Sequence, residues 1–171
     1  SMVGNLTIGK KRYQPVKAEV EKLREKAILV MQKLQKAAVE DGEAFRAYLR
    51  ASEMSSDNPA AIRQRSLTLE LAAERMTRIP LAIAIHCVEI LSLARELAPI
   101  GDIRSISDAG VAIQLAHAAL QSALLTVDIN LPVLRDAEFA DSVRKQRSQL
   151  AESASDSLST GIREVSRRIS A

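Results

Sequence analysis

The chain has 171 residues and a mass of 18.6 kDa, which is the size of one domain with its own core. Hydrophobic residues make up 47% and charged residues 26%, a composition typical of soluble globular proteins. Four aromatic side chains and a net charge of +3 argue against a nucleic-acid binder, and one cysteine excludes an internal disulfide and a thiolate zinc site.

The composition favours long helices. Alanine and leucine dominate, whereas only 6 Gly and 5 Pro interrupt the chain. We therefore predict an all-α fold, a multihelical antiparallel bundle in which residues 1–171 form a single domain, with at least ~70% helix and no sheet. The two histidines have no acidic or thiol partner at ligand spacing, so no metal site is expected. Nothing at the N-terminus resembles a signal peptide, and we expect a cytoplasmic protein that binds neither nucleic acid nor a membrane.

Two helical segments are predicted in the N-terminal third. Residues 2–9 are short and apolar and resemble the end of a helix. A second helix follows Pro15, because the first turn of a helix tolerates proline. Apolar residues then recur every three or four positions, which predicts a helix to about Glu40, or onward through an Asp-Gly pair to Leu49.

The middle of the chain is predicted to hold the most buried helix. Residues 52–59 form a loop, and Asn58 is a suitable cap for a helix that begins with the following proline. This helix should run to about Ile79, where Pro80 is expected to kink or break it. Ten of the thirteen residues in Leu81–Leu93 are apolar, so this segment is expected at the centre of the bundle.

Two more helices complete the prediction. One opens at Ser105–Asp108, with Ser105 or Ser107 as cap, and ends near Asn130. Small residues recur along it at spacings of three and four, which lets another helix approach closely. The last helix begins at Asp136 and carries a thin apolar stripe, as expected for packing on the outside of the bundle or across an interface.

No generic catalytic motif occurs in the sequence, so the candidates for chemistry are individual polar residues. Asp108 is the first of them. It lies at a predicted helix N-terminus, where the helix dipole stabilises a carboxylate. On the sequence alone, a structural first-turn acid is the simpler interpretation. The alternative is a carboxylate presented at an opening between helices, where it can accept or relay a proton.

Other polar residues also have two interpretations. Lys10 and Lys11 are either a solvated helix end or a clamp for an acidic ligand, with Asn5 just before them. Asn130 is either a helix cap or a buried hydrogen-bonding group that faces a ligand. His86 and Cys87 are expected in the core, and His117 either lines a pocket or lies on the surface.

Five segments occur in an order and spacing that resemble a known family. They are NLTIGKKRY (5–13), EDGEAF (40–45), IPL (79–81), SDAGVA (107–112) and ALLTVDINL (123–131). Together they resemble the cyclodeaminase domain of formimidoyltransferase-cyclodeaminase and its stand-alone relatives, which include methenyltetrahydrofolate cyclohydrolases. The resemblance extends from Ser1 to about Phe139, and the last 30 residues match only as a polar helix.

The resemblance implies a methenyltetrahydrofolate cyclohydrolase-like helical dimer that acts on folate substrates without a cofactor. The main expectation is a formimidoyltetrahydrofolate cyclodeaminase, which closes 5-formimidoyltetrahydrofolate to 5,10-methenyltetrahydrofolate and releases ammonia. The alternatives are a methenyltetrahydrofolate cyclohydrolase and a non-catalytic scaffold, and a formimidoyltransferase is a further candidate partner. Asp108 would be catalytic. The substrate-binding residues would be Asn5, Lys10, Lys11, Tyr13, Ser107 and Asn130; Gly9, Asp41, Phe45 and Gly110 also match the family.

The chain departs from the family pattern in three places. A Gly-rich segment that usually precedes the first matching motif is expected to contribute to the folate site and is missing here. Family members often have Gly-Asn-x-Asn before SDAG, where this chain has Gly101-Asp102-Ile103-Arg104. They also often have Asn at the position of Thr126. The changes at Asp102, Arg104 and Thr126 each replace a neutral amide near the expected site.

Overall fold

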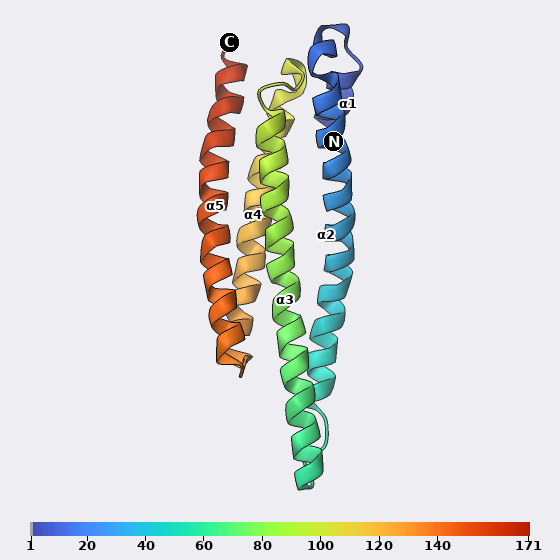
Figure 1. The fold of residues 1–171 in the computed structure, drawn as a ribbon, viewed down its shortest axis with the longest axis vertical. Helices are drawn as coiled ribbons and strands as arrows, with labels where there is room; N and C mark the ends of the chain where they lie inside the picture. Colours follow the sequence, from blue (N-terminus) through green and yellow to red (C-terminus); the bar gives the residue numbers. More distant parts are fainter. Residues whose placement is uncertain (1) are drawn as a thin grey trace.

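The computed structural model describes residues 2–171 as an all-α fold (Figure 1). Helices account for 89% of the chain, and residues 2–171 contain no strand, which confirms the predicted fold class. The α-helices are α1 (Met2–Ile8), α2 (Lys17–Ser52), α3 (Pro59–Leu97), α4 (Ile106–Asn130) and α5 (Ala137–Ile169). Three short 3₁₀ segments connect them: η1 (Lys11–Val16), η2 (Ile103–Ser105) and η3 (Leu131–Val133).

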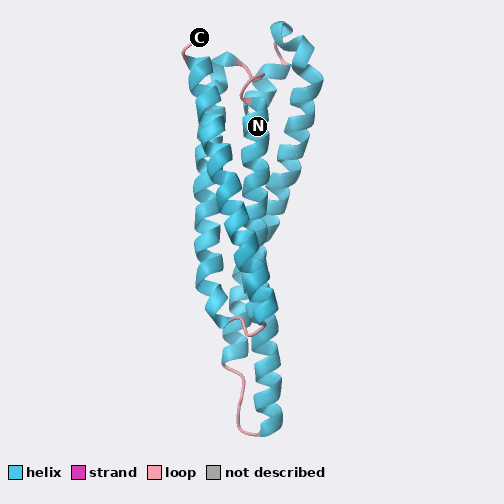
Figure 2. Ribbon diagram, turned by 60° about the vertical axis from the view of Figure 1, so that its left-hand side comes forward, coloured by secondary structure: helices cyan, strands magenta, loops and turns pink. Residues whose placement is uncertain are grey.

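The four long helices run antiparallel to their neighbours in the chain (Figures 1 and 2). Helix α3 is central and packs against α2, α4 and α5, while the short α1 packs against α2 and α4. The α2–α3 hairpin projects past the ends of α4 and α5. Helix α1, the C-terminus and the loop that leads into α4 lie at the opposite end of the bundle from the tip of this hairpin.

Helix α2 takes the longer of the two predicted lengths and continues to Ser52. Its buried residues include an unbroken series at a spacing of seven: Leu23, Val30, Ala37, Ala44 and Ala51. Because this repeat keeps one face of α2 against α3, tertiary packing offsets the helix-weakening effect of Gly42, which costs about 1 kcal/mol relative to alanine. The predicted loop and the Asn58 cap are also confirmed, since Asn58 Oδ1 accepts a hydrogen bond from Ala61 N at 2.9 Å.

The break expected at Pro80 does not occur, and α3 continues through it to Leu97. Proline has no amide hydrogen, so the carbonyl of Met76, four residues earlier, loses its normal helical donor. The side chain of Asn130 replaces that donor, because its Nδ2 donates to the Met76 carbonyl at 2.8 Å in a buried position. A contact from α4 therefore compensates for the defect in α3.

This compensation predicts a specific coupling between Asn130 and Pro80. We expect Asn130→Ala to lower the free energy of unfolding by about 1–2 kcal/mol, because it leaves a buried carbonyl without a partner. In a Pro80→Ala background the amide of residue 80 can donate to Met76, so the same change should cost much less. Urea unfolding of the four proteins, followed by circular dichroism, measures this coupling; an equal cost in both backgrounds would contradict it.

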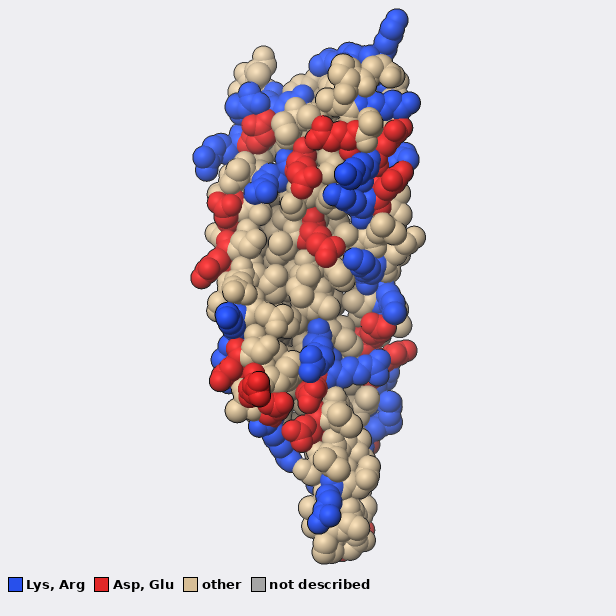
Figure 3. All heavy atoms as spheres, viewed as in Figure 1, with Lys and Arg blue, Asp and Glu red and all other residues tan. Residues whose placement is uncertain are grey.

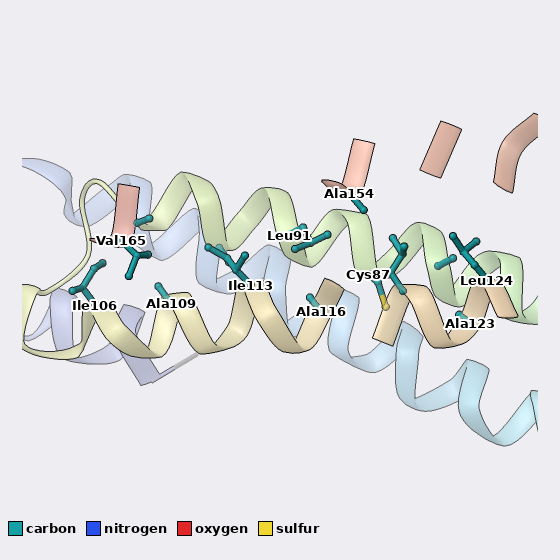
Figure 4. Close-up of a cluster of buried hydrophobic side chains, with 14 residues drawn as sticks. Cys87, Leu91, Ile106, Ala109, Ile113, Ala116, Ala123, Leu124, Ala154 and Val165 are labelled. Carbon is teal, nitrogen blue, oxygen red and sulfur yellow. The ribbon is translucent and has the colours of Figure 1, made fainter. Parts of the chain in front are cut away.

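The main core lies between α3, α4 and α5 (Figure 4). Helix α5 comes close to α4 at two glycines: a Cβ atom on Gly161 would lie 2.7 Å from Ile113 Cδ1, and one on Gly110 would lie 3.1 Å from Val165 Cγ1. The close approach predicted from the small residues of α4 is thus confirmed. The stripe on α5 is also confirmed as partly buried, although Ile169 at its end is exposed.

Leu81–Leu93 lies at the centre of the bundle as predicted, because α3 packs against α2, α4 and α5, but it is not the most buried helical segment, since α4 has a larger fraction of buried residues. Only Leu81, Ala84, Cys87 and Leu91 of this segment are buried, whereas α4 buries 10 of its 25 residues. Cys87 lies in the core as expected, and burial raises the pKa of its thiol. Most other residues of Leu81–Leu93 are half-buried, whereas α4 combines its buried face with an exposed one that includes Leu115, Leu125 and Ile129.

Two helical segments are long and apolar enough to span a membrane by length and composition: Pro59–Leu97 and Ile103–Val133, with mean hydropathies of 1.5 and 1.4 over their best windows. They include α3 and α4, which pack against each other along the bundle. The core helices of soluble bundles have the same length and apolar composition, so these two features are shared by core helices and membrane-spanning helices.

Candidate functional site

A cavity of about 340 Å³ opens between α1, α2, α3 and α4, at the end of the bundle where α4 begins. Most of its lining is apolar, including Val3, Leu23, Ile90 and Ala109. Its volume lies within the range of small-molecule sites, which are usually apolar hollows with a few polar groups that converge on them. The charged residues that line it are Asp108 and Arg24.

Asp108 lies in the first turn of α4 and is half-buried at this cavity. Its carboxylate forms no hydrogen bond or ion pair with any side chain of residues 2–171. Ser105 occupies the predicted N-cap position, but its hydroxyl donates to the carbonyl of Asp102 at 3.3 Å instead of capping the helix. The carboxylate therefore stays free at the N-terminus of the helix, where it can exchange a proton with a ligand.

Arg24 is the other charged residue at the cavity, and it reaches there from α2. It shares a helix face with Val20, Ala27 and Met31, which also line the cavity. Its Nη1 donates to Asn5 Oδ1 at 3.3 Å, while its Nε is buried without an acceptor among residues 2–171. Asn5, predicted to bind substrate, is exposed on α1 and contacts Arg24.

A buried polar network surrounds Asp102, next to the cavity. Asp102 is 1% exposed and forms an ion pair with Lys10. Tyr13 donates its hydroxyl hydrogen to Asp102 Oδ1 at 3.2 Å, and the same hydroxyl accepts from Ile103 N at 3.0 Å. Thr7 Oγ1 accepts from Asp102 N at 2.8 Å. The network ties α1 and η1 to the loop before α4.

The pKa of Asp102 is lowered, above all by the hydrogen bond from Lys10. Burial acts in the opposite direction, and the backbone amide of Arg104 and the hydroxyl of Tyr13 add to the lowering. The sequence singled out position 102 only as an acid where relatives often have an amide. In this fold the acid is the counter-ion of Lys10, which compensates for its burial.

The network changes the interpretation of the basic segment, residues 10–12. Lys10, predicted as part of a clamp for an acidic ligand, and Tyr13, a substrate-binding residue implied by the resemblance, both contact Asp102 instead. Lys11, Arg12 and Arg104 remain exposed and surround an open hollow beside Asp102. These three cations are therefore available to an acidic ligand in this hollow.

The structure brings most of the predicted site residues together, with one exception. Asn5, Lys10, Lys11, Tyr13 and Ser107 all lie near the end of the bundle where Asp108 is found, and Ser107 is exposed beside it. Asn130 lies at the opposite end of α4, 22 residues away, or about 33 Å along the helix. Its amide donates to Met76, so within one chain its role is structural.

The remaining candidates do not form a further site. Phe45 is exposed on α2, and Asp41 is half-buried there. His86 Nδ1 lies 3.4 Å from Glu89 Oε1, and His117 Nε2 lies 3.4 Å from Gln121 Nε2, so each histidine contacts a neighbour on its own helix. No group of three or more His, Cys, Asp or Glu side chains within residues 2–171 is arranged to hold a metal ion.

Sequence reasoning missed Arg24 as a site residue. A signal was present, because Arg24 interrupts an otherwise apolar series at spacings of four, three and four: Val20, Arg24, Ala27 and Met31. A charged residue on an apolar helix stripe is either paired in the core or directed at a cavity.

Comparison with known proteins gives consistent results. A family model described as formiminotransferase-cyclodeaminase matches residues 1–149. A methenyltetrahydrofolate cyclohydrolase from Methylorubrum extorquens AM1 is 37% identical over 146 residues, which cover 85% of this chain and 70% of that protein. The formimidoyltransferase-cyclodeaminase of Sus scrofa is 29% identical over 154 residues; these cover 90% of this chain but only 28% of the pig protein.

A solved structure also matches the fold. The crystal structure of formiminotetrahydrofolate cyclodeaminase from Thermotoga maritima superimposes with a TM-score of 0.73 at 25% identity, covering 99% of this chain and 78% of that one. The family match extends over most of the sequence and includes Asp108 and the basic segment. The chain therefore belongs to the formiminotransferase-cyclodeaminase family.

Proposed function

We propose that the protein is an enzyme of folate one-carbon chemistry that closes 5-formimidoyltetrahydrofolate to 5,10-methenyltetrahydrofolate and releases ammonia. The observation that carries this proposal is the unpaired carboxylate of Asp108 at an apolar cavity. The match to the Thermotoga cyclodeaminase over nearly the whole chain supports it.

The reaction suits a site with one carboxylate. N10 of the folate attacks the formimidoyl carbon and loses a proton, and a tetrahedral carbon forms between N5 and N10. The leaving nitrogen must then gain a proton before ammonia departs. A single positioned carboxylate can accept the first proton and return it, which contributes on the order of 10²–10⁴-fold. Because the reacting atoms belong to one bound molecule, orientation supplies much of the remaining rate enhancement.

A second candidate is the cyclohydrolase reaction, favoured by the 37% identity to the Methylorubrum protein. Here water attacks the cationic methenyl carbon and loses its proton, and the bond between N5 and that carbon then breaks. This reaction passes through a similar tetrahedral carbon and needs the same kind of proton carrier. The two candidates therefore share Asp108 and the cavity.

We place the acidic glutamate tail of the folate at Lys11, Arg12 and Arg104, the exposed cations around the hollow beside Asp102. Guanidinium and ammonium groups bind carboxylates well. Within this proposal the enzyme works in the cytoplasm without a cofactor, and a formimidoyltransferase supplies its substrate.

Within the same proposal the active form is a homodimer that pairs through α4. Helix α4 has no Asp, Glu, Lys or Arg between residues 109 and 127. Its outward residues recur at alternating spacings of four and three, the repeat of helices that pack in pairs. They are Val111, Leu115, Ala118, Ser122, Leu125 and Ile129. Leu125 is 67% exposed and Ile129 is 75% exposed in the single chain, so a second copy across a two-fold axis would cover both.

We expect Leu125→Lys to convert the dimer to a monomer, because it places a charge in an apolar interface. Leu71 is similarly exposed, at 69%, but lies on α3, so Leu71→Lys should leave the dimer intact. Light scattering at micromolar concentration distinguishes the two states. A monomeric unsubstituted protein, or dissociation by Leu71→Lys alone, would contradict the α4 interface.

Assaying both reactions on one preparation tests the proposed function. Formation of 5,10-methenyltetrahydrofolate from the formimidoyl substrate, and its consumption in water, both change the ultraviolet absorbance. Turnover of the formimidoyl compound supports the cyclodeaminase, and turnover of the methenyl compound alone supports the cyclohydrolase. Binding of reduced folates without either turnover would identify the non-catalytic scaffold, and calorimetry that detects no binding would refute the folate proposal.

A further inference from the structure

We propose that Arg24 positions the substrate by donating hydrogen bonds to the ring carbonyl of the pterin, while Asp108 faces the one-carbon bridge. This inference rests on the proposed function, because it assigns the orientation of a folate in the cavity between α1, α2, α3 and α4. It concerns a residue that the sequence motifs do not include.

The state of the Arg24 side chain is the first observation. A guanidinium has five N–H donors, yet its one hydrogen bond to a side chain among residues 2–171 is the 3.3 Å contact from Nη1 to Asn5. Its Nε is buried without an acceptor. Leaving such a donor unsatisfied is costly, so the arrangement is explained if a ligand draws the guanidinium into the cavity and accepts from it.

The relation of Arg24 to Asp108 is the second observation. The two residues line the same cavity and carry opposite charges, yet no ion pair within 4.0 Å joins them. Both are half-buried in a largely apolar lining, and neither charge has the other as its partner. A ligand that accepts hydrogen bonds on one side and exchanges a proton on the other would fit between the two groups.

The pterin ring presents these two functions close together. Its ring carbonyl is on the carbon next to the one bonded to N5, and the one-carbon unit is attached to N5. A donor on the carbonyl therefore places N5 and its substituent a few ångströms away, on the side where a carboxylate would reach them. Arg24 on α2 and Asp108 on α4 line one cavity and supply the donor and the carboxylate that this arrangement of the pterin needs.

The glutamate tail is a weaker assignment for Arg24. The tail is flexible and strongly hydrated, and exposed cations are already available to it at Lys11, Arg12 and Arg104. Arg24 instead lies among apolar residues such as Leu23 and Ala27, which suit the flat face of a ring. Asn5 would then act through Arg24, because it holds one end of the guanidinium.

The test measures binding of two folates by calorimetry with the full chain. One is 5-formyltetrahydrofolate, and the other is its 4-amino counterpart, in which an amino group replaces the ring carbonyl and turns the acceptor into a donor. The unsubstituted protein should bind the first more tightly by about 10- to 100-fold, the value of a hydrogen bond to a charged group. Arg24→Met should lose about that much affinity for 5-formyltetrahydrofolate and discriminate between the two by less than about 3-fold.

Two further variants complete the design. Arg24→Lys keeps the charge but not the planar fork of donors, so its affinity and discrimination should be intermediate. Arg50→Met removes an exposed arginine near the end of the same helix and should behave like the unsubstituted protein. Circular dichroism checks the helix content of each variant, and Arg24→Lys provides the comparison if Arg24→Met does not fold.

The outcomes separate this inference from the proposed function. If the unsubstituted protein binds neither folate, the proposed function fails and this inference fails with it. If it binds 5-formyltetrahydrofolate but the Arg24 variants keep full affinity and discrimination, only the role of Arg24 is refuted. An equal loss of affinity for both folates in Arg24→Met also refutes it, because Arg24 would then support the cavity without contacting the carbonyl.

Discussion

Asp108→Asn is expected to lower turnover about 100-fold or more while leaving the fold and the proposed dimer intact. The substitution keeps the size of the side chain and removes its ability to carry a proton. Because the Asp108 carboxylate makes no bond to another side chain within residues 2–171, its removal should cost little stability. Steady-state rates with the formimidoyl and methenyl substrates measure the effect, and circular dichroism measures helix content.

Asp156→Asn is a matched control, because Asp156 is an exposed aspartate on α5. It removes the same charge at an exposed site on another helix, outside the residues that line the cavity, and should leave the rate unchanged. The most informative failure would be an Asp108→Asn protein that unfolds or that keeps its normal rate. Either result would return Asp108 to the simpler interpretation, an acid that stabilises the first turn of α4.

Of the substitutions proposed for this protein, Asp102→Asn is expected to have the largest effect on stability. It should lower the free energy of unfolding by about 2–3 kcal/mol at neutral pH. It removes the counter-ion of Lys10 and a charged acceptor of Tyr13 in a buried position. The cost should stay below that of a fully buried pair, because the Lys10 side chain is 32% exposed and can turn towards water. Urea unfolding at pH 7 measures it.

The pH dependence of this effect has a definite sign. The folded-state pKa of Asp102 is lowered relative to the ordinary value near ~3.9, so the stabilisation is present above that value and disappears as the pH falls through the folded-state pKa. The difference in stability between the unsubstituted protein and Asp102→Asn should therefore be constant near neutrality and shrink below about pH 4. A difference that grows on acidification would contradict the ion pair.

Glu164 provides a control for this measurement. Its pKa is also lowered, chiefly by a hydrogen bond from Arg167, but Arg167 is largely exposed to solvent. Glu164→Gln should therefore change the free energy of unfolding by less than about 1 kcal/mol, the range of surface ion pairs. Comparing the two variants isolates the contribution of burial around Asp102.

The elements of the fold were determined largely by local sequence. Asn58 caps α3 as predicted, and Asp136, where the last helix was predicted to begin, caps α5; the side-chain acceptor of each lies three residues from its donor. Asp108 was placed correctly in the first turn of α4, because helix starts depend on neighbouring residues. The repeat at a spacing of seven continues to Ala51 and indicates the longer form of α2. Interactions of this kind are readable without knowledge of the fold.

The pairing of polar groups was decided by tertiary structure. Lys10 meets Asp102 across 92 residues of sequence, and Asn130 meets Met76 across 54. The first contact pairs Lys10, which was expected to bind substrate, with Asp102. The second supplies a donor to the Met76 carbonyl, which Pro80 leaves without one. Arg24 and Asp108 line one cavity only because α1, α2, α3 and α4 come together around it at one end of the bundle. Helical periodicity predicts which face of each helix is buried, but the partner of a buried polar group depends on how the helices pack, which that periodicity does not specify.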